Sequence, residues 1–231
     1  MTEQRGLRER KKQDTREAIA ETARRLFSEH GFDAVTVADV ARAADVSRKT
    51  VFNYFPTKED LVYWRLEGFE AALLAAVRDR APGESYLGAF GRFVLAPRGL
   101  LAREDPEAIE ALAALTRMVI ESQALLERER QILERYTASL ADLIAEEAGG
   151  DTAAVTPWVA ANALMGVHRA LVDYTRGRIV AGARNPRLAR EVRAEGERAL
   201  ALLERGLGQF GVRTVKADRK QRVPPTRRRH A

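Results

Sequence analysis

The side chains best suited to recognise another molecule stand close together in one short stretch of the chain. Ser47 is a favourable N-cap, so the sequence predicts a helix that begins at Arg48. Lys49 and Thr50 then lie in its first turn, and Asn53 follows one turn later. Arg and Lys donate hydrogen bonds to guanine O6 and N7, and Asn pairs with adenine N6 and N7. Such a helix could read DNA bases, although a solvated helix face would explain the same residues in isolation.

Other kinds of chemistry find little support in the sequence. The chain contains no Cys, which excludes a disulfide scaffold, a thiolate zinc site, an iron–sulfur cluster and a Cys nucleophile. Its three His, at positions 30, 168 and 230, argue against a His-rich metal site. The GxxxxGK(S/T), HExxH and GxSxG motifs are absent, as are the Glu-x-x-His pairs of a di-iron bundle. We therefore expect no enzyme, no catalytic residue, no metal and no cofactor.

The net charge of +6 is concentrated at the C-terminus. Residues 1–80 carry 15 basic and 14 acidic side chains, residues 81–209 carry 16 and 18, and residues 210–231 carry 8 and 1. Nucleic-acid binding must therefore be inferred from local clusters of basic residues rather than from the overall charge. The longest uncharged stretch, 152–168, is too short and too polar to span a bilayer, and no secretory signal is visible. We expect a cytoplasmic, nucleoid-associated protein that does not bind a membrane.

The spacing of apolar residues predicts helices throughout the chain and strands nowhere, and hence an all-α fold. The first helix is expected over 15–30, where Ile19, Ala23 and Phe27 form one apolar stripe. The later helices are expected over 37–44, 48–54, 58–79, 84–95, 106–120, 122–148, 156–176 and 186–207. Six basic residues before or at the start of the first helix form an arm, which could follow phosphates or merely raise solubility: Arg5, Arg8, Arg10, Lys11, Lys12 and Arg16.

The two short helices at 37–44 and 48–54 are joined by only three residues, which is the helix-turn-helix pattern. Thr36 and Asp39 have the spacing of a capping box, and the stretch from Thr57 to Asp60 repeats it. Helices of this length require tertiary packing, because they are not stable alone in water. A generic helical hairpin would show the same local features.

The full string from Thr36 to Leu61, TVADVARAADVSRKTVFNYFPTKEDL, closely resembles the TetR family of bacterial transcriptional regulators. The resemblance is strong over 15–66, and beyond that only the arrangement of helices fits. It implies a three-helix DNA-binding domain at 1–60 with its basic arm, followed by a helical effector-binding and dimerisation domain at 61–210. Residues 211–231 form a basic tail that we expect to be disordered. Asp45 stands where the family most often has Gly, and Asp tolerates the left-handed conformation that this turn needs.

The resemblance also implies the roles of individual residues on DNA. The helix at 48–54 should enter the major groove and present its N-terminal residues to base edges. Phosphate contacts should come from Tyr54, from Lys58, and from the hydroxyl and backbone N–H of Thr36. Phe55 is expected in the core, whereas Phe52 either packs there or touches a thymine methyl or a sugar. The expected DNA-contact residues are Thr36, Ser47, Arg48, Lys49, Thr50, Phe52, Asn53, Tyr54 and Lys58.

The uncharged stretch from Thr152 to Val167 predicts a helix that is buried nearly all round. In the resembled family the last two large helices pair with their copies in a second subunit, and 156–176 and 186–207 match those helices. Small residues such as Ala163 and Gly166 would allow close approach. We therefore expect a C2 homodimer, which would read two half-sites of double-stranded operator DNA.

A pocket between bundle helices would suit a small lipophilic or aromatic effector. For His168, a hydrogen-bonded core or interface histidine is the simpler interpretation. The candidate lining residues are Met118, Glu121, Tyr136, Trp158, Asn162, Met165, His168 and Arg169.

The resemblance implies a repressor that leaves its palindromic operator when the effector binds. The effector would favour a conformation in which the two recognition helices are wrongly spaced. A ligand-independent regulator or an activator is the alternative from the same sequence, and an all-helical enzyme is the least supported.

Overall fold

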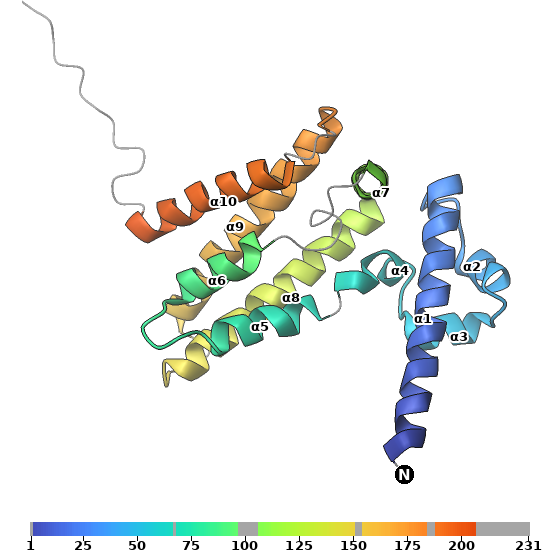
Figure 1. Ribbon diagram of the computed structural model, residues 1–231, viewed down its shortest axis with the longest axis horizontal. Coiled ribbons are helices and arrows are strands. Elements are labelled where there is room, and N and C mark those ends of the chain that lie inside the picture. The colour runs from blue at the N-terminus through green and yellow to red at the C-terminus, as the bar shows by residue number, and fades with distance from the viewer. Residues whose placement is uncertain (1, 67, 97–105, 151–153, 184–187, 207–231) are drawn as a thin grey trace, which may run out of the picture.

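The computed structural model describes the chain except for residues 1, 67, 97–105, 151–153, 184–187 and 207–231. The described part contains helices and no strands, which confirms the all-α fold class (Figure 1). None of its helices combines the length and apolar character that a membrane crossing requires. The tail expected at 211–231 lies outside the described residues. The helices are α1 (Thr2–His30), α2 (Val37–Ala43), α3 (Arg48–Tyr54), α4 (Asp60–Tyr63), η1 (Trp64–Leu66), α5 (Phe69–Arg78), α6 (Tyr86–Leu95), α7 (Pro106–Glu121), α8 (Gln123–Glu147), α9 (Val155–Val180) and α10 (Leu188–Arg205).

The first three helices pack around a small core of their own, and α4 closes it. Both short helices have the bounds that their caps predict, α2 to within one residue and α3 without any difference. Each has only two turns, so burial of one face and capping of its end stabilise it rather than its own backbone bonds. The most deeply buried side chains of this core are Ile19, Phe27, Val40, Val51, Phe55 and Leu61.

Helix α1 begins much earlier than expected, at Thr2 rather than near residue 15. The stretch 2–14 is rich in Glu, Gln, Lys and Arg, all good helix formers, and it contains no Pro. The amide of Gln13 donates to the carboxylate of Glu17 at 2.8 Å, one turn further along the helix. The basic residues therefore belong to a continuous helix, and the expectation of an arm ahead of it was wrong.

The single helix expected over 58–79 was also wrong, because the chain breaks there into α4, the 3₁₀ turn η1 and α5. Gly68 lies at the break with φ of +82°. Glycine adopts this left-handed conformation at little cost, and the conformation cannot continue a right-handed helix. The apolar pattern concealed the break, because an isolated Gly within a helical pattern is often tolerated.

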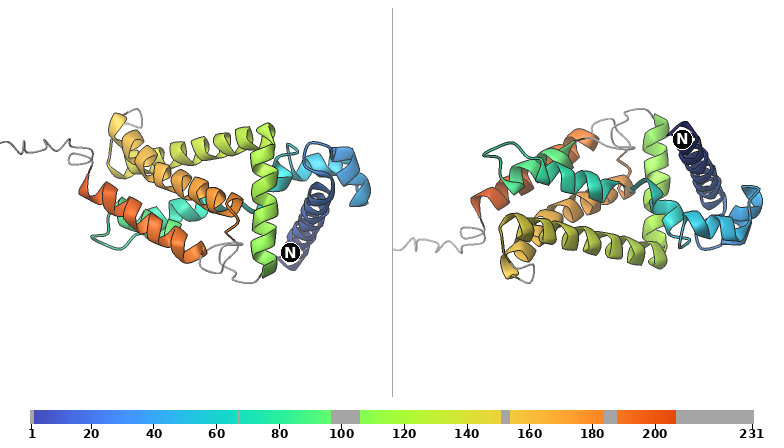
Figure 2. Two further views of the ribbon diagram at one scale, coloured as in Figure 1. Left: turned by 90° about the horizontal axis from the view of Figure 1, so that it is seen from above. Right: turned by 90° about the horizontal axis from the view of Figure 1, so that it is seen from below.

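The remaining helices form a bundle whose core is separate from the N-terminal one. Its buried side chains come from α5, α6, α8 and α9, with Leu73, Phe90 and Leu140 among the least exposed. Helix α7 stands across the end of the bundle, between it and the N-terminal helices (Figure 2). Gly196 allows α10 to lie close to α6 and α9, since a Cβ atom there would collide with Leu95. The bounds of α6 to α10 agree with the expected ranges to within four residues.

Candidate DNA-binding surface and bundle sites

Helix α3 turns a polar face outward. Its cap is present, because Ser47 Oγ accepts a hydrogen bond from the backbone N–H of Thr50 at 3.0 Å. The Ser47 and Thr50 hydroxyls also lie 2.8 Å apart. Arg48, Lys49 and Asn53 are exposed, so their donor groups are accessible to a DNA groove.

The turn before α3 has the conformation that the sequence predicts. Asp45 has φ of +52°, the one left-handed residue other than glycine in the described part of the chain. The next residue continues the turn, since the N–H of Val46 donates to the carbonyl of Ala41 at 2.9 Å. The turn is thus kept with Asp in place of Gly.

The two phenylalanines near α3 differ in burial. Phe55 is 1% exposed and belongs to the N-terminal core, which confirms the expectation for it. Phe52 is 49% exposed, so its ring is available to a partner.

Thr36 begins α2 in a complete capping box. Its hydroxyl and its backbone N–H both donate to Asp39 Oδ2, at 2.6 and 3.0 Å, and its Oγ1 accepts from the Asp39 N–H. These hydrogen bonds, the one from the Thr36 hydroxyl foremost, lower the pKa of Asp39. A phosphate at Thr36 would therefore have to share these donors with a carboxylate.

Tyr54 and Lys58 lie half-buried where α3 ends and α4 approaches. The Lys58 ammonium stands 4.1 Å from the centroid of the Phe32 ring, a cation–π contact. Phe32 in turn meets Phe27 edge to face, with 5.0 Å between ring centroids. The side chain of Lys58 thus packs against the segment that follows the C-terminal end of α1.

The N-terminal core is completed by residues of the bundle. Val119 of α7 and Leu125 of α8 are buried in it. Between them, the hydroxyl of Ser122 donates to Asp33 Oδ1 at 3.0 Å. The α7–α8 junction is therefore part of the platform that carries α2 and α3.

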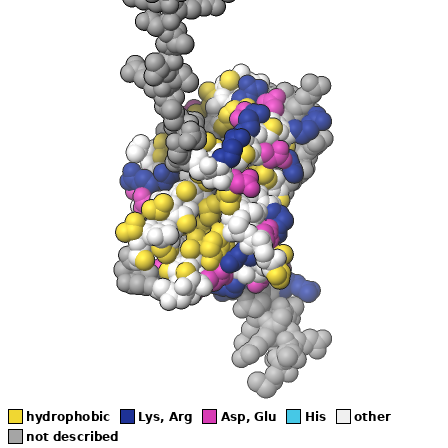
Figure 3. Space-filling view, turned by 90° about the vertical axis from the view of Figure 1, so that its left-hand side faces the viewer, with side chains coloured by type: hydrophobic (Ala, Val, Ile, Leu, Met, Phe, Trp, Pro, Cys, Tyr) yellow, Lys and Arg dark blue, Asp and Glu magenta, His cyan; other side chains and the backbone are white. Residues whose placement is uncertain are grey.

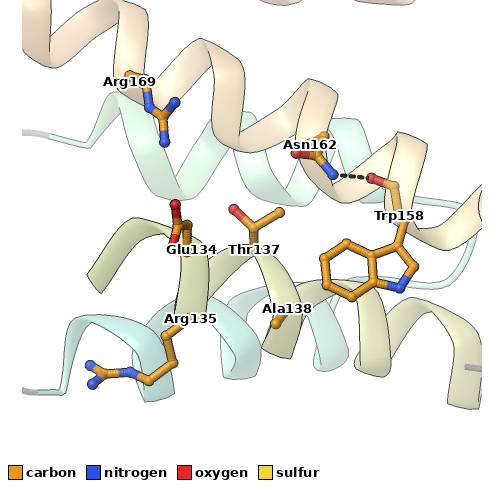
Figure 4. A pocket seen from close by; sticks show the side chains of 7 residues that line it. All are labelled: Glu134, Arg135, Thr137, Ala138, Trp158, Asn162 and Arg169. Carbon is orange, nitrogen blue, oxygen red and sulfur yellow. Dashed lines mark hydrogen bonds between the residues drawn. The ribbon is translucent and has the colours of Figure 1, made fainter. Parts of the chain in front are cut away.

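A cavity of about 550 Å³ opens between α8 and α9 (Figure 4). Three of the expected effector-pocket residues line it, Trp158, Asn162 and Arg169. The indole of Trp158 closes one end, and Arg169 points toward Glu134 at the other. The residues of α8 that line the cavity were not expected from the sequence, because only the register of α8 against α9 reveals them. They are Glu134, Arg135, Thr137 and Ala138.

The structure does not bring the other expected pocket residues to this cavity. Met118 packs against the N-terminal core, and Glu121 is exposed at the end of α7. Tyr136 and Met165 are buried in the bundle core.

His168 lies in an aromatic cluster rather than in the cavity. Its ring centroid is 5.2 Å from that of Phe69, and Phe69 stacks on Tyr136 and meets Phe93 edge to face. Burial lowers the pKa of His168 to about 4, so the imidazole is neutral at neutral pH. This environment favours the core interpretation of the residue.

The outer face of α9 carries an exposed stripe without Lys or Arg at its start. Val155 and Val159 are 74% and 61% exposed, and Gly166 and Gly177 follow at helical spacing with open space where a Cβ would stand. Figure 3 shows hydrophobic side chains gathered at the end of the bundle away from the N-terminal helices, where α9 begins. The helix is thus not buried all round within one subunit.

Within the described residues, no group of three or more His, Asp or Glu side chains could hold a metal ion. The sequence does contain one GxGxxG string, at 206–211. It directly follows α10, whereas a dinucleotide-binding loop of this kind follows a strand.

Comparison with known proteins agrees with this geometry. Residues 19–63 match the family model described as bacterial regulatory proteins, tetR family. The HTH-type transcriptional regulator TcmR of Streptomyces glaucescens is 30% identical over 148 residues, which cover 63% of this chain and 66% of TcmR. The HTH-type transcriptional repressor AcnR of Corynebacterium glutamicum is 34% identical over 94 residues, 41% of this chain and 43% of AcnR.

A solved structure shares the fold over most of the chain. NalD, the secondary repressor of the MexAB-OprM multidrug efflux pump in Pseudomonas aeruginosa, superposes with a TM-score of 0.53 at 22% identity. The match covers 81% of this chain and 97% of NalD.

Together with these relatives, the capped helix-turn-helix and its helical bundle identify a DNA-binding transcriptional regulator, of a family whose members are not enzymes. Within that class, the chain belongs to the TetR family of bacterial regulatory proteins.

Proposed function

We propose that the protein is a dimeric repressor that binds a palindromic operator through α3 and leaves it when a small effector occupies the bundle. The observation that carries the proposal is the first turn of α3, which Ser47 caps and which presents Arg48 and Lys49 to solvent. A recognition helix reads bases with this end. The name of AcnR, a repressor, supports the same direction of regulation.

The contacts divide into two kinds. Arg48, Lys49, Thr50 and Asn53 face the base edges, and Phe52 reaches a thymine methyl or a sugar. Ser47 caps the helix that presents them. Thr36, Tyr54 and Lys58 position the domain on the phosphates, which carries no sequence information by itself.

The second copy of the chain covers the exposed stripe of α9. A helix that exposes Val155 and Val159 leaves apolar area in water, and Gly166 lets a partner helix approach closely. A two-fold dimer then presents two copies of α3 to one face of the DNA.

The effector occupies the cavity between α8 and α9. Its volume of about 550 Å³ lies in the range of small-molecule sites. Trp158 offers an aromatic face, while Arg169 and Asn162 offer polar anchors. A lipophilic or aromatic molecule fits this lining.

The test begins with the wild-type protein selecting a preferred duplex from a random pool. Each variant is then titrated against that duplex and a scrambled one at several salt concentrations. Arg48→Ala or Lys49→Ala should lose about 1–3 kcal/mol of discrimination at one position of each half-site. Arg193→Ala, which removes an exposed charge from α10, is the matched control and should bind as the wild type does.

Equal losses on both duplexes for the two α3 variants would show that neither side chain reads sequence. A wild-type protein that selects no duplex at all would contradict the proposed function as a whole. For the effector, compounds that bind the protein yet leave its operator affinity unchanged would remove the inducer from the proposal, because binding and release must be coupled reciprocally.

A further inference from the structure

The break at Gly68 raises the question of what fixes the N-terminal helices relative to the bundle. A continuous helix from residue 58 to residue 79 would transmit orientation by its own stiffness, and the chain has none there. Side-chain contacts must supply the orientation instead. Besides the packing of the α7–α8 junction on the N-terminal core, these contacts form two groups on the connector, one before the break and one after it, and both come from α8.

Before the break, α8 grips α4 through one carboxylate. Arg128 donates to Asp60 Oδ1 from both Nε and Nη2, at 3.0 and 2.7 Å. The side chains of Arg128 and Asp60 are only 27% and 14% exposed, so water screens the pair weakly. The other oxygen, Oδ2, accepts the backbone N–H of Thr57 at 3.0 Å, and the Asp60 N–H donates back to Thr57 Oγ1 at 3.3 Å.

The same carboxylate therefore does two things at once. It closes the capping box that starts α4, directly after α3 and next to Lys58, and it ties that box to α8. A second contact lies one turn along, where the hydroxyl of Tyr63 donates to the carbonyl of Leu125 at 3.0 Å. We call the Asp60–Arg128 pair and the Tyr63–Leu125 bond the α4 clamp.

The α4 clamp is connected to α9, the helix that lines the cavity. Glu129 lies beside the Tyr63 hydroxyl, and burial together with this carboxylate raises the pKa of Tyr63. Arg176 of α9 pairs with Glu129 at 2.6 Å, with side chains 20% and 13% exposed. A shift of α9 against α8 would thus reach α4 through largely buried charged groups.

After the break, α8 holds α5 in a second and separate way. Arg135 Nε donates to Glu70 at 2.9 Å, and Ser139 Oγ donates to the same carboxylate at 2.6 Å. Between these two groups, Tyr136 donates its hydroxyl to the carbonyl of Leu66 in η1, just before the break, at 3.2 Å. Glu70 belongs to the bundle side of Gly68, so its pair with Arg135 orients no part of the N-terminal domain.

We propose that Arg128 is a positioning residue for DNA recognition. By holding Asp60 it sets the angle at which α3 stands on α8, and so the spacing of the two recognition helices in the dimer. The inference rests on the proposed function, because it presupposes that α3 binds DNA. It adds that the bundle controls α3 through an ion pair on α8 and not through a rigid connecting helix.

Arg128→Ala is the direct test, and Arg130→Ala is its matched control. Both remove one arginine of α8, so the change in net charge is the same, but Arg130 is exposed and pairs with Glu127 and Glu134 of its own helix. Against the duplex that the wild type selects, Arg128→Ala should bind about five- to thirty-fold more weakly, the size of effect that residues coupling two sites commonly have. Arg130→Ala should stay within about twofold of wild type, because its partners lie on α8 and not on the connector.

Scrambled duplex separates positioning from general damage. Phosphate-driven binding tolerates a range of orientations, so Arg128→Ala should keep wild-type affinity for scrambled DNA and the wild-type salt dependence. A destabilised domain would instead lose affinity for both duplexes in proportion to its unfolded fraction. Thermal melting of each variant, followed by circular dichroism, gives that fraction.

Three further variants keep the result interpretable. Asp60→Asn retains an oxygen for the Thr57 cap and loses the charge that Arg128 needs, so it should reproduce the Arg128→Ala defect. The double variant, with Arg128→Ala and Asp60→Asn, should bind the selected duplex no more weakly than either single variant, since the two residues act through one contact. Arg128→Lys keeps the charge with a single donor group and should recover part of the affinity.

The inference is overturned if Arg128→Ala and Arg130→Ala bind the selected duplex alike. It is equally overturned if Arg128→Ala weakens both duplexes and lowers the salt slope, because Arg128 would then contact phosphate directly. If the wild type selects a duplex but the α8 variants do not show the expected affinities, this inference is wrong while the proposed function is still supported. If the wild type selects no duplex, both the inference and the proposed function are wrong.

Discussion

The helices that would face DNA and the helices of the bundle owe their stability to different interactions. Helices α2 and α3 have seven residues each, and side chains of Thr36 and Ser47 cap them. Helices α8 and α9 have 25 and 26 residues and begin without a side-chain cap hydrogen bond. In a two-turn helix a cap is a large share of the stability, whereas a long helix is stabilised by its buried face.

The exposed surfaces of the two regions also depend on different interactions, local caps in one and contacts between long helices in the other. The exposed face of α3 carries Arg48 and Lys49, whose position depends on local caps. The exposed face of α9 carries Val155, Val159 and Gly166, and its role depends on what packs against it. The first region is therefore sensitive to single local changes, and the second to changes at contacts between long helices.

The largest expected effect concerns the bundle face alone. Gly166→Arg should dissociate the proposed dimer, because it places a charge where two α9 helices would cross closely. An uncompensated buried charge costs about 3–5 kcal/mol, enough to raise the dimer dissociation constant more than about a hundredfold. Sedimentation or light scattering at micromolar concentration measures the mass directly.

Gly150→Arg is the matched control for that change. Gly150 also has open space around its Cβ position, but it lies at the end of α8 and not on α9. The control should stay dimeric. A wild-type protein that is monomeric under these conditions would refute the dimer. A dimeric Gly166→Arg variant would show that the interface does not include this face of α9.

The next effect contrasts a buried histidine of the bundle with a surface histidine of α1. The folded-state pKa of His168 is about 4, below the unfolded value of 6.5, because burial disfavours the charged form. As the pH falls below 6.5, His168 binds a proton in the unfolded chain but not in the folded chain, so the free energy of unfolding decreases. The total loss approaches about 3 kcal/mol near pH 4, of which about 2 kcal/mol is present at pH 5.

Urea unfolding at pH 7 and pH 5 measures this effect by difference. His168→Gln removes the titrating group, so its stability relative to wild type should rise by about 2 kcal/mol between pH 7 and pH 5. His30→Gln, at an exposed histidine of α1, is measured alongside it as the control. A constant difference between His168→Gln and wild type would show that the imidazole is not buried as the structure places it.

A third prediction concerns the kind of DNA contact made beside α3. Lys58→Ala should weaken binding to selected and scrambled duplexes alike and lower the salt slope by about one per subunit, because one fewer counterion is released. Arg48→Ala should leave the scrambled duplex nearly unaffected. An unchanged salt slope for Lys58→Ala would mean that its ammonium remains over Phe32 and contacts no phosphate.

Helices α2 and α3 and the turn between them could be predicted almost residue by residue because their signals are local. Caps lie within three residues of the groups they satisfy, so Thr36, Ser47 and Thr57 place their hydrogen bonds from sequence alone. Asp45 likewise takes the conformation that its type permits. For the bundle, the sequence predicts helices and their approximate ends but not which faces meet.

Two failures show why the bundle was harder. Gly68 permits a break without requiring one, and the contacts that accompany the break, such as Glu70 with Arg135, join α5 to α8. The cavity wall at Glu134 and Thr137 depends on the register of α8 against α9. Contacts of this kind join residues more than 20 positions apart, which the periodicity of one helix does not report.

The smallest expected effect tests the comparison most directly. Ser47 caps α3, and Ser85 caps α6 of the bundle in the same way, with its Oγ accepting the N–H of Gly88 at 3.1 Å. Ser47→Ala and Ser85→Ala should each lower the free energy of unfolding by about 1 kcal/mol, as loss of a serine cap commonly does. Only Ser47→Ala should also weaken binding to the selected duplex, because a two-turn α3 frays at the end that meets the bases, whereas α6 lies away from that surface. Urea unfolding and duplex titration of the two variants give both quantities. Equal duplex affinities would show that packing of Val51 and Phe55 fixes α3 without its cap, and that the two regions are held in the same way after all.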